Sequence, residues 1–539
     1  MKEIKQVVVA LCFIFHVAQG YAQATPGGNE EMVMSPEEWK IKFASTITKA
    51  ELKEHLEVLA SDAYEGRETG KPGQKKAAQY IADYYKALGI EPCNGGSYFQ
   101  QYPLKTTRNN EASLEINGKE FKFIEHFYFF GGFEGVDVSL ENCVFAGYGI
   151  EEEKYNDYEG LDVKGKVVLV LSGEPKSKGK SLITGNSEAS VWAYDMESKN
   201  LLAKSKGAKA MILIDDAYSD YISRIRYWLE QPMMQLDKPG DGSGELIPYA
   251  VCREEVGDAL LAGAKKKPIS KHILAISKKG RPKSFDFTGN GIFHAKRVVS
   301  AIAAENVLAY IEGSDPKLKN EIVVVSAHYD HIGITNGEIN NGADDDGSGT
   351  VSTLEIAEAL MLAKKEGFGT RRSILILNVS GEEKGLLGSE WYSEYPVFPL
   401  ENTVCDLNVD MIGRKDSLHT TGNYVYLIGS DKLSTELHTL SENCNSKYTN
   451  LYLDYTYNDP NDPNRFYYRS DHYNFAKHNI PVIFYFTGVH EDYHKPGDDV
   501  EKIMFDKMET IARLIFYTAW EVANRDEKLK VDVKNDFKE

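Results

Sequence analysis

The sequence predicts an α/β fold, and three observations lead to this prediction. Short apolar runs of the length of buried strands recur in the C-terminal half, at residues 322–325, 372–379, 407–411 and 480–486. Apolar residues at helical spacing predict helices at residues 48–59, 75–88, 351–363 and 502–524. From about residue 141 the pattern changes to short strands separated by glycine-rich turns, at residues 143–150, 167–171, 210–214 and 272–276. The chain therefore combines an α/β part with a mainly β part.

Length and composition indicate a multidomain globular protein. A chain of 539 residues is too long for one hydrophobic core, so we expect two or three domains. With 42% hydrophobic and 27% charged residues, the composition is that of an ordinary soluble protein. Lys+Arg number 62 against 81 Asp+Glu, which gives a net charge of -19. This balance argues against nucleic acids and anionic membrane surfaces as partners.

Residues 1–22 have the pattern of a secretory signal peptide. Lys2 and Lys5 precede an apolar core at residues 7–18, and Gly20-Tyr21-Ala22 supplies small residues for cleavage. The apolar core is too short to span a membrane. No later window is apolar and long enough for a transmembrane helix, so we expect an exported protein, periplasmic or secreted, without a membrane span.

Polar side chains follow the predicted strands of the C-terminal half. They are His328, Asp330 and His331 after the first strand, Glu382 and Glu383 after the second, Asp410 at the end of the third, and His490 and His494 after the fourth. Such strand ends hold ligands in open α/β sheets. The acidic loop at residues 342–349 alone suits a solvated turn as well as it suits a cation site. Together with the other strand ends, it gives the nitrogen and oxygen ligand set that suits zinc.

Five segments carry a resemblance to a known family. AHYDHIG, NGADDDGSGT, SGEEKGLLGS, NVDMIG and HKPGDD, in this order, resemble the co-catalytic zinc exopeptidases that include bacterial aminopeptidases and glutamate carboxypeptidase. The resemblance extends from about residue 306 to the end of the chain, and it implies a mixed sheet flanked by helices. It also implies two zinc ions bridged by Asp345. His328 and Asp410 would complete one zinc site, and Glu383 and His494 the other.

The same resemblance implies roles for three further residues. Glu382 falls on the general base of the family, and Asp330 matches the carboxylate that orients a metal-binding imidazole. Tyr467 lies near the position of a tyrosine that polarises the substrate carbonyl, although the local sequence departs from the family pattern. Four further histidines near these motifs are interpreted as structural: His331, His472, His478 and His490.

Amide hydrolysis requires these side-chain types independently of the resemblance. A metal lowers the pKa of its bound water from about 15.7 toward ~7, and two metals roughly 3.5–4 Å apart can hold both the water and the scissile carbonyl. A free carboxylate beside them can pass the proton to the leaving amine. Alone, the pair Glu382 and Glu383 would suit a solvated helix start; beside the other candidate ligands, the pair favours catalysis.

A second resemblance concerns the short-strand region. VFAGYGI, DYEGLDVKGKVVLV and KGAKAMILI resemble a protease-associated domain, which the same family inserts ahead of its metal-binding part. We expect this insert to shape substrate access as a lid or spacer. In the EGRETG loop at residues 65–70, the charged residues are expected to close the loop on itself. The predicted domains are a signal peptide (1–22), an N-terminal peptidase part (23–140), the insert (141–295) and the zinc peptidase domain (296–539).

These observations predict an exported, zinc-dependent aminopeptidase with peptide substrates. The acids around the metals should attract the α-ammonium group of a peptide. A zinc carboxypeptidase of the same fold stays open, because Arg414 and Arg469 lie near the motifs and could bind a terminal carboxylate. A non-catalytic binding module and a single-zinc glutaminyl cyclase are further alternatives, which the complete ligand set disfavours.

Overall fold

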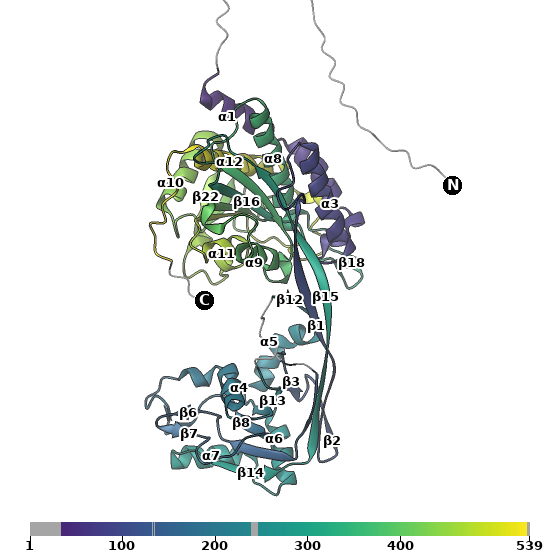
Figure 1. Ribbon diagram of the computed structural model, residues 1–539, viewed down its shortest axis with the longest axis vertical. Helices are drawn as coiled ribbons and strands as arrows, with labels where there is room; N and C mark the ends of the chain where they lie inside the picture. Colours follow the sequence, from purple (N-terminus) through teal and green to yellow (C-terminus); the bar gives the residue numbers. More distant parts are fainter. Residues whose placement is uncertain (1–33, 132, 134, 239–245, 536–539) are drawn as a thin grey trace, which may run out of the picture.

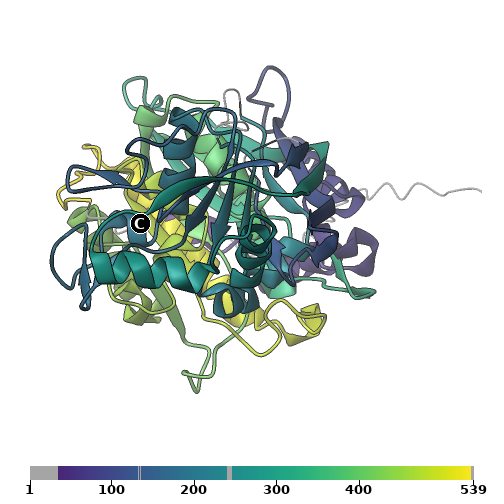
Figure 2. The same cartoon turned by 90° about the horizontal axis from the view of Figure 1, so that it is seen from below.

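The structure is a computed structural model that describes residues 34–131, 133, 135–238 and 246–535. It consists of a larger α/β domain and an inserted domain, which lie one above the other along the longest axis (Figure 1). From below, the inserted domain lies in front of the larger domain (Figure 2). The predicted signal peptide, residues 1–22, falls outside the described residues. Among the described helices, none has the length and apolar character needed to cross a membrane.

A mixed sheet forms the centre of the larger domain, as predicted. Its strand order is β12-β1-β15-β19-β16-β20-β23-β21-β22. Strands β19, β16, β20 and β23 run parallel, whereas β1, β15 and β21 pair antiparallel with a neighbour. The strands are β1 (Phe99–Ile116), β12 (Met233–Leu236), β15 (Gly291–Ile311), β16 (Ile322–His328), β19 (Ser373–Val379), β20 (Thr403–Val409), β21 (Tyr424–Ile428), β22 (Tyr452–Asp454) and β23 (Val482–Phe486).

Helices cover both faces of this sheet because its central strands are apolar on both sides. In β16, Val323 and Val325 pack into one core, while Ile322 and Val324 pack into the other. The first core holds helices α1 (Pro36–Ala44), α2 (Lys49–Leu59), α3 (Pro72–Ala87), α8 (Gly349–Lys365), α10 (Thr435–Cys444) and α12 (Phe505–Asn524). The second core holds α9 (Leu387–Glu394) and α11 (His472–Ala476).

The inserted domain has its own sheet, in the order β14-β5-β8-β11-β13-β3. The strands are β3 (Phe127–Tyr128), β5 (Asn142–Ala146), β8 (Val167–Leu171), β11 (Ala210–Ile214), β13 (Tyr249–Cys252) and β14 (Ser284–Thr288). Its helices are α4 (Met196–Ser205), α5 (Tyr218–Glu230), α6 (Glu254–Gly263) and α7 (Ile269–Lys279). A separate core of buried residues supports this sheet, so the insert packs as a domain of its own.

One predicted strand of the insert is wrong. Residues 272–276 lie in helix α7, where Ile269, His272 and Ile276 are buried at helical spacing. Gly280 ends the helix in a left-handed conformation, with φ of 60°. A five-residue apolar run fits a strand and a helix equally well, and here the helix buries its apolar side.

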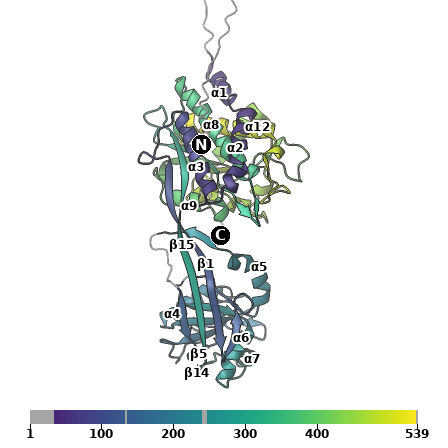
Figure 3. The ribbon, with the colours of Figure 1, turned by 90° about the vertical axis from the view of Figure 1, so that its right-hand side faces the viewer.

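Two long strands join the domains. β1 pairs antiparallel with β15 from Phe99↔Val307 to Ile116↔Gly291, with an irregularity between Asn109 and Glu111. Figure 3 shows this pair running from the larger domain into the insert. The short strand β12 then returns from the insert and pairs with the outer edge of β1, at Leu104↔Leu236. Strands β1, β15 and β12 therefore link the insert to the larger domain.

A buried lysine lies at the start of α12. Lys507 is 6% exposed, and its Nζ lies 3.5 Å from the ring centroid of Tyr424. Among the described residues, Nζ has no hydrogen-bond partner. Burial lowers the pKa of Lys507 to about 7, although Asp344 and Asp416 oppose the shift.

Lys507→Met is therefore expected to stabilise the protein, and most strongly below pH 7. The unfolded chain keeps the lysine charged up to about pH 10.5, so the folded-state penalty is complete below pH 7 and fades toward pH 10.5. The measurement is the melting temperature at pH 6 and pH 9, with the exposed Lys365→Met as control. A lower melting temperature for Lys507→Met at pH 6 would contradict the expectation.

Candidate metal centre

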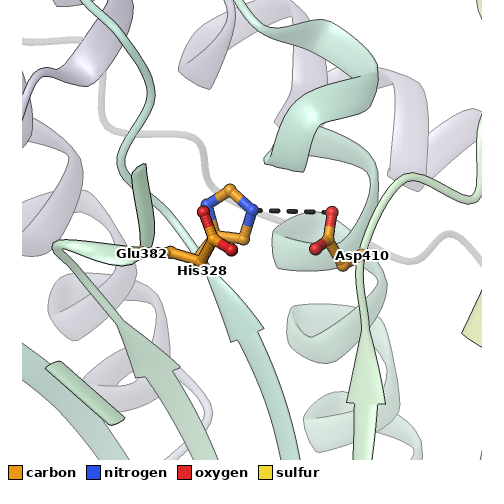
Figure 4. A group of neighbouring side chains, drawn as sticks. All are labelled: His328, Glu382 and Asp410. Carbon is orange, nitrogen blue, oxygen red and sulfur yellow. Dashed lines mark ion pairs between the residues drawn. The ribbon is translucent and has the colours of Figure 1, made fainter. Parts of the chain in front are cut away.

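The five predicted ligands meet at one edge of the sheet. His328 ends β16, Asp410 directly follows β20, and Glu383 follows β19. Asp345 lies in the loop before α8, and His494 in the loop after β23. The parallel strands all end at this edge, so residues far apart in the sequence converge there. Figure 4 shows His328, Glu382 and Asp410 pointing toward one another.

Asp345 lies between the two predicted halves of the site. Its Oδ1 lies 3.4 Å from His328 Nε2, which is also 3.5 Å from Asp410 Oδ1. The other oxygen, Oδ2, lies 3.1 Å from His494 Nε2. His494 Nε2 is also 3.1 Å from Glu383 Oε2. Each oxygen of Asp345 therefore faces a different histidine and carboxylate pair.

The donor atoms of this cluster suit metal ions. His328 Nε2, Asp345 Oδ2 and Glu383 Oε1 are buried and make no well-aligned hydrogen bond among the described residues, although each lies 2.7–3.4 Å from another candidate ligand. Burying such groups without partners is costly, and coordination to a cation removes this cost. Ligand atoms of His328, Glu382 and Asp410 lie within 4.8 Å of one another, as do those of His331, Asp345 and Glu383. Histidine and carboxylate donors without cysteine fit zinc.

His331, which we interpreted as structural from the sequence, lies inside the cluster. Its Nδ1 lies 2.7 Å from Glu383 Oε1 and 3.8 Å from Asp345 Oδ2. A Cβ at Gly342 would lie 2.5 Å from the His331 ring, and Gly342 also has a φ of +57°. A glycine is therefore required there. The spacing of His331 from His328 in HYDH was the only sequence signal for this position.

Neighbouring glutamates differ in their environments. Burial raises the pKa of Glu382 well above its usual range, and Glu383 adds to this rise although the charge of His328 opposes it. Burial and Asp345 also act to raise the pKa of Glu383, but His331 and His494 outweigh them and lower it to about 2. Glu383 is thus suited to remain an ionised ligand, whereas Glu382 is suited to carry a proton.

Asp330 is hydrogen-bonded to two segments beside the cluster. Its Oδ2 accepts a hydrogen bond from Thr69 Oγ1 at 2.6 Å, and its Oδ1 accepts one from the Glu382 backbone N–H at 3.3 Å. The predicted contact with the His328 ring is less direct. His328 Nδ1 lies 3.8 Å from Asp330 Oδ1 but 3.2 Å from the Asp330 carbonyl oxygen. Asp330 therefore contacts both the His328 segment and the glutamate loop.

The EGRETG loop does more than close on itself. Arg67 is 1% exposed, and its guanidinium donates to the carbonyl oxygens of Tyr329, Leu59, Asn341 and Gly342 at 2.6–2.8 Å. Three of these carbonyls belong to the segments that carry His328 and Asp345: Tyr329 to the first, and Asn341 and Gly342 to the second. Arg67 therefore fixes two ligand-bearing segments, a long-range contact that local sequence does not reveal.

The acids beside Asp345 are held by backbone donors. Asp344 Oδ1 accepts from the Gly413 N–H at 2.6 Å, and Asp346 Oδ1 accepts from the Gly349 N–H at 2.8 Å. Asp498 Oδ2 in turn accepts from the N–H groups of Asp344 at 3.0 Å and Asp345 at 3.1 Å. Asp344, Asp345 and Asp346 are all buried. The loop is therefore a structured part of the site and not a solvated turn.

A small pocket of about 30 Å³, lined largely by aromatic rings, opens beside the cluster. It is lined by Asp345, Glu382, Asp410, Met411, Phe466, Arg469, Phe484, Phe486, Val489 and Tyr493. Tyr493 stacks on His494, with ring centroids 3.8 Å apart. The pocket therefore places apolar rings next to the predicted ligands.

The structure does not bring Tyr467 to this pocket. Phe466 and Tyr467 both lie in a 3-10 turn, but their side chains enter different pockets. Tyr467 packs near Gly429 and Lys432, whose Nζ is 5.1 Å from the ring centroid. Tyr493 is the tyrosine that lines the pocket with Glu382. Adjacent positions in a tight turn point in different directions, which the sequence could not resolve.

Comparisons with known proteins agree with these features. Residues 306–519 match the model of peptidase family M28, and residues 136–260 match the PA domain. A probable leucine aminopeptidase of Arthroderma benhamiae is 32% identical over 216 residues, which cover 39% of this chain and 56% of that protein. The probable leucine aminopeptidase 2 of Aspergillus oryzae is 24% identical over 466 residues, which cover 85% of this chain and 76% of that protein.

The fold also resembles a solved structure. An aminopeptidase from Aneurinibacillus sp. strain AM-1 aligns with a TM-score of 0.50 and 19% identity, over 92% of this chain and 98% of that one. The chain spans about half the length of the Arthroderma relative, with 56% covered. The chain therefore contains a peptidase family M28 domain with a PA domain inserted ahead of it.

Proposed function

We propose that the protein is an exported, zinc-dependent aminopeptidase that removes N-terminal residues from peptides. One observation carries this proposal: the two oxygens of Asp345 face separate histidine and carboxylate pairs, with Glu382 beside them. The family M28 match supports peptide hydrolysis, and the two relatives described above are named as probable leucine aminopeptidases. The proposal of export rests on the pattern of residues 1–22.

The donor set fits two zinc ions, with Asp345 shared between them. His328 and Asp410 would hold one ion, and Glu383 and His494 the other. When bound, zinc supplies a water of lowered pKa and polarises the scissile carbonyl. His331 lies close enough to Glu383 to fix the orientation of that carboxylate, at 2.7 Å.

Glu382 is proposed as the general base. Its carboxylate takes the proton of the attacking water and then donates it to the leaving amine. Burial raises the pKa of Glu382, which makes its carboxylate a better acceptor for the proton of the water. The backbone N–H of Glu382 donates a hydrogen bond to Asp330 Oδ1 at 3.3 Å. This bond fixes the position of the backbone from which the Glu382 side chain extends.

The pocket indicates what the first residue of the substrate should be. Phe466, Phe484 and Phe486 offer an apolar surface against which a small hydrophobic side chain can pack. Asp345, Glu382 and Asp410 lie on the same pocket and attract the α-ammonium group. Tyr493, rather than Tyr467, is therefore the tyrosine proposed to contact the substrate.

A chelator is expected to abolish hydrolysis, and added zinc should restore it. The reason is that the buried histidines and carboxylates cannot activate water without a cation. The measurement is release of free amino acids from a peptide library by purified protein, before and after dialysis against chelator. Full activity in protein shown by elemental analysis to be metal-free would contradict the zinc mechanism.

A carboxypeptidase is the second candidate, and Arg469 favours it. Arg469 lines the pocket, with its guanidinium 4.9 Å from the ring centroid of Phe466. Among the described residues it makes no ion pair, so a substrate carboxylate could bind there. Arg414, by contrast, lies 3.1 Å from Asp492 and 3.4 Å from Glu491. Arg414 is therefore less suited to bind a substrate.

Blocking each end of one peptide separates the two candidates. An aminopeptidase should lose activity when the N-terminus is acetylated and keep it when the C-terminus is amidated. The acetyl group removes the ammonium charge that the acidic site attracts. The measurement is the initial rate for the four combinations of free and blocked ends. Cleavage that survives acetylation and is lost on amidation would favour the carboxypeptidase and Arg469.

A further inference from the structure

Helix α9 connects the proposed catalytic loop to the inserted domain. The turn Glu382–Lys384 follows β19, and α9 begins three residues later at Leu387. The Leu386 N–H donates to the Glu382 carbonyl oxygen at 2.9 Å, and the Leu387 N–H donates to the Gly381 carbonyl oxygen at 2.9 Å. A shift of α9 would therefore move the backbone of the glutamate loop.

Local sequence gives α9 little stability of its own. The helix spans only eight residues, and short helices depend on tertiary packing. Leu386 occupies the N-cap in a left-handed conformation with φ of 62°, and no side chain caps the first turn. The position of α9 is therefore set by what packs against it.

A segment that leaves the insert and joins the edge of the larger sheet packs against α9. We name residues 233–238 the docking segment; it comprises β12 and the two residues after it. Leu236 is 5% exposed and lies in a small core with Tyr102, Leu104, Ala304 and Leu387. Trp391 of α9 packs against the same core. The docking segment thus buries apolar surface on the first two turns of the helix.

Charged contacts continue this interface. Lys238 Nζ lies 2.5 Å from Glu390 Oε1 and 2.8 Å from Glu394 Oε2. The three side chains are 25%, 28% and 32% exposed, so solvent only partly screens the pairs. One lysine therefore holds two glutamates on successive turns of α9.

The strands that carry the insert hold the other side of the same loop. Tyr102 Oη of β1 donates to the Ser380 carbonyl oxygen at 2.8 Å. Asn306 of β15, which is fully buried, donates through Nδ2 to the Gly388 carbonyl oxygen at 2.8 Å. The insert and its connecting strands thus contact the segment on both sides of Glu382.

We propose that the docking segment is a positioning element for catalysis: it holds α9, and through α9 it holds Glu382 and Glu383 in their working positions. This inference rests on the proposed zinc peptidase function. It assigns the insert a role in the chemical step, in addition to any effect on substrate access. A displacement of a catalytic group by about 1 Å can lower the catalytic rate roughly 10²-fold.

The test is charge reversal at Lys238. Lys238→Glu places a third carboxylate beside Glu390 and Glu394 and should push α9 away. We expect kcat to fall roughly tenfold with KM nearly unchanged, because the pocket residues are untouched. Zinc affinity should fall as well, since Glu383 moves with the helix; it is measured by competition with a chelator of known affinity.

A matched control and a rescue separate positioning from general damage. Lys206→Glu makes the same charge change in the insert, where Lys206 pairs with Glu151 at 2.6 Å and does not contact α9. The control should keep kcat and zinc affinity. Adding Glu390→Lys and Glu394→Lys to Lys238→Glu should restore both quantities. Leu236→Ala, which weakens the apolar part of the contact, should also lower kcat without raising KM.

The outcomes distinguish this inference from the proposed function. If the unaltered protein shows no zinc-dependent hydrolysis, the proposed function fails. If it is active but Lys238→Glu matches the control, the docking segment has no positioning role. Two further results would overturn the inference. In the first, kcat falls only in proportion to the loss of folded protein measured by circular dichroism. In the second, the charge swap does not restore kcat.

Discussion

Glu382→Gln is expected to lower kcat by roughly 10²-fold or more while leaving bound zinc in place. Glutamine keeps the shape of the side chain but cannot accept the proton of the attacking water. The backbone contact that places residue 382, from its N–H to Asp330 Oδ1 at 3.3 Å, is unchanged by the substitution. Steady-state kinetics and elemental analysis on the same sample measure the two quantities.

Glu401→Gln provides the control, because Glu401 is an exposed glutamate far from the cluster in sequence and should behave as the unaltered protein. Two results would reverse the assignment of Glu382. Loss of zinc would make Glu382 a ligand, a possibility that its closeness to His328 and Asp410 raises. Full activity with full zinc would remove Glu382 from the mechanism.

Asp345→Ala is expected to release both zinc ions together. Asp345 offers one oxygen to each half of the site, 3.4 Å from His328 Nε2 and 3.1 Å from His494 Nε2. Its loss also removes a negative charge that offsets the charge of both cations. Zinc content per chain after dialysis at fixed free zinc measures the effect.

His494→Ala is the comparison for this prediction. It removes a donor from one half only, so it should weaken one ion and spare the other. His494 is also the most exposed of the predicted ligands, at 37% of its side chain, so its replacement disturbs packing least. An Asp345→Ala protein that still holds two zinc ions would show that the aspartate does not bridge them.

Much of the larger domain could be predicted because its signals are local. The run of β-branched residues before His328 forms β16, and the apolar spacing near the C-terminus forms α12. The helix prediction began at residue 502, whereas α12 begins at Phe505 after a short turn that includes Lys502. Helix ends depend on capping geometry, which periodicity alone does not specify.

Contacts between distant segments could not be predicted from the sequence. Arg67 binds carbonyl oxygens of Asn341 and Gly342, and nothing near Arg67 in the sequence indicates this. The pairing of β12 with β1 is similar, because a four-residue strand forms only against an existing edge. The placement of Tyr493 instead of Tyr467 at the pocket depends on turn geometry in two separate loops.

The paired strands β1 and β15 also bear on the order of folding. They lie on either side of the insert in the sequence, and Ile116 pairs with Gly291. Closing so long a loop is entropically unfavourable, and the contact forms slowly if the chain must find it by diffusion. The core of the insert includes residues from both flanks, such as Leu114 and Ala295. Folding of the insert would therefore bring β1 and β15 together. The sheet of the larger domain would then be completed on this strand pair, which has already formed.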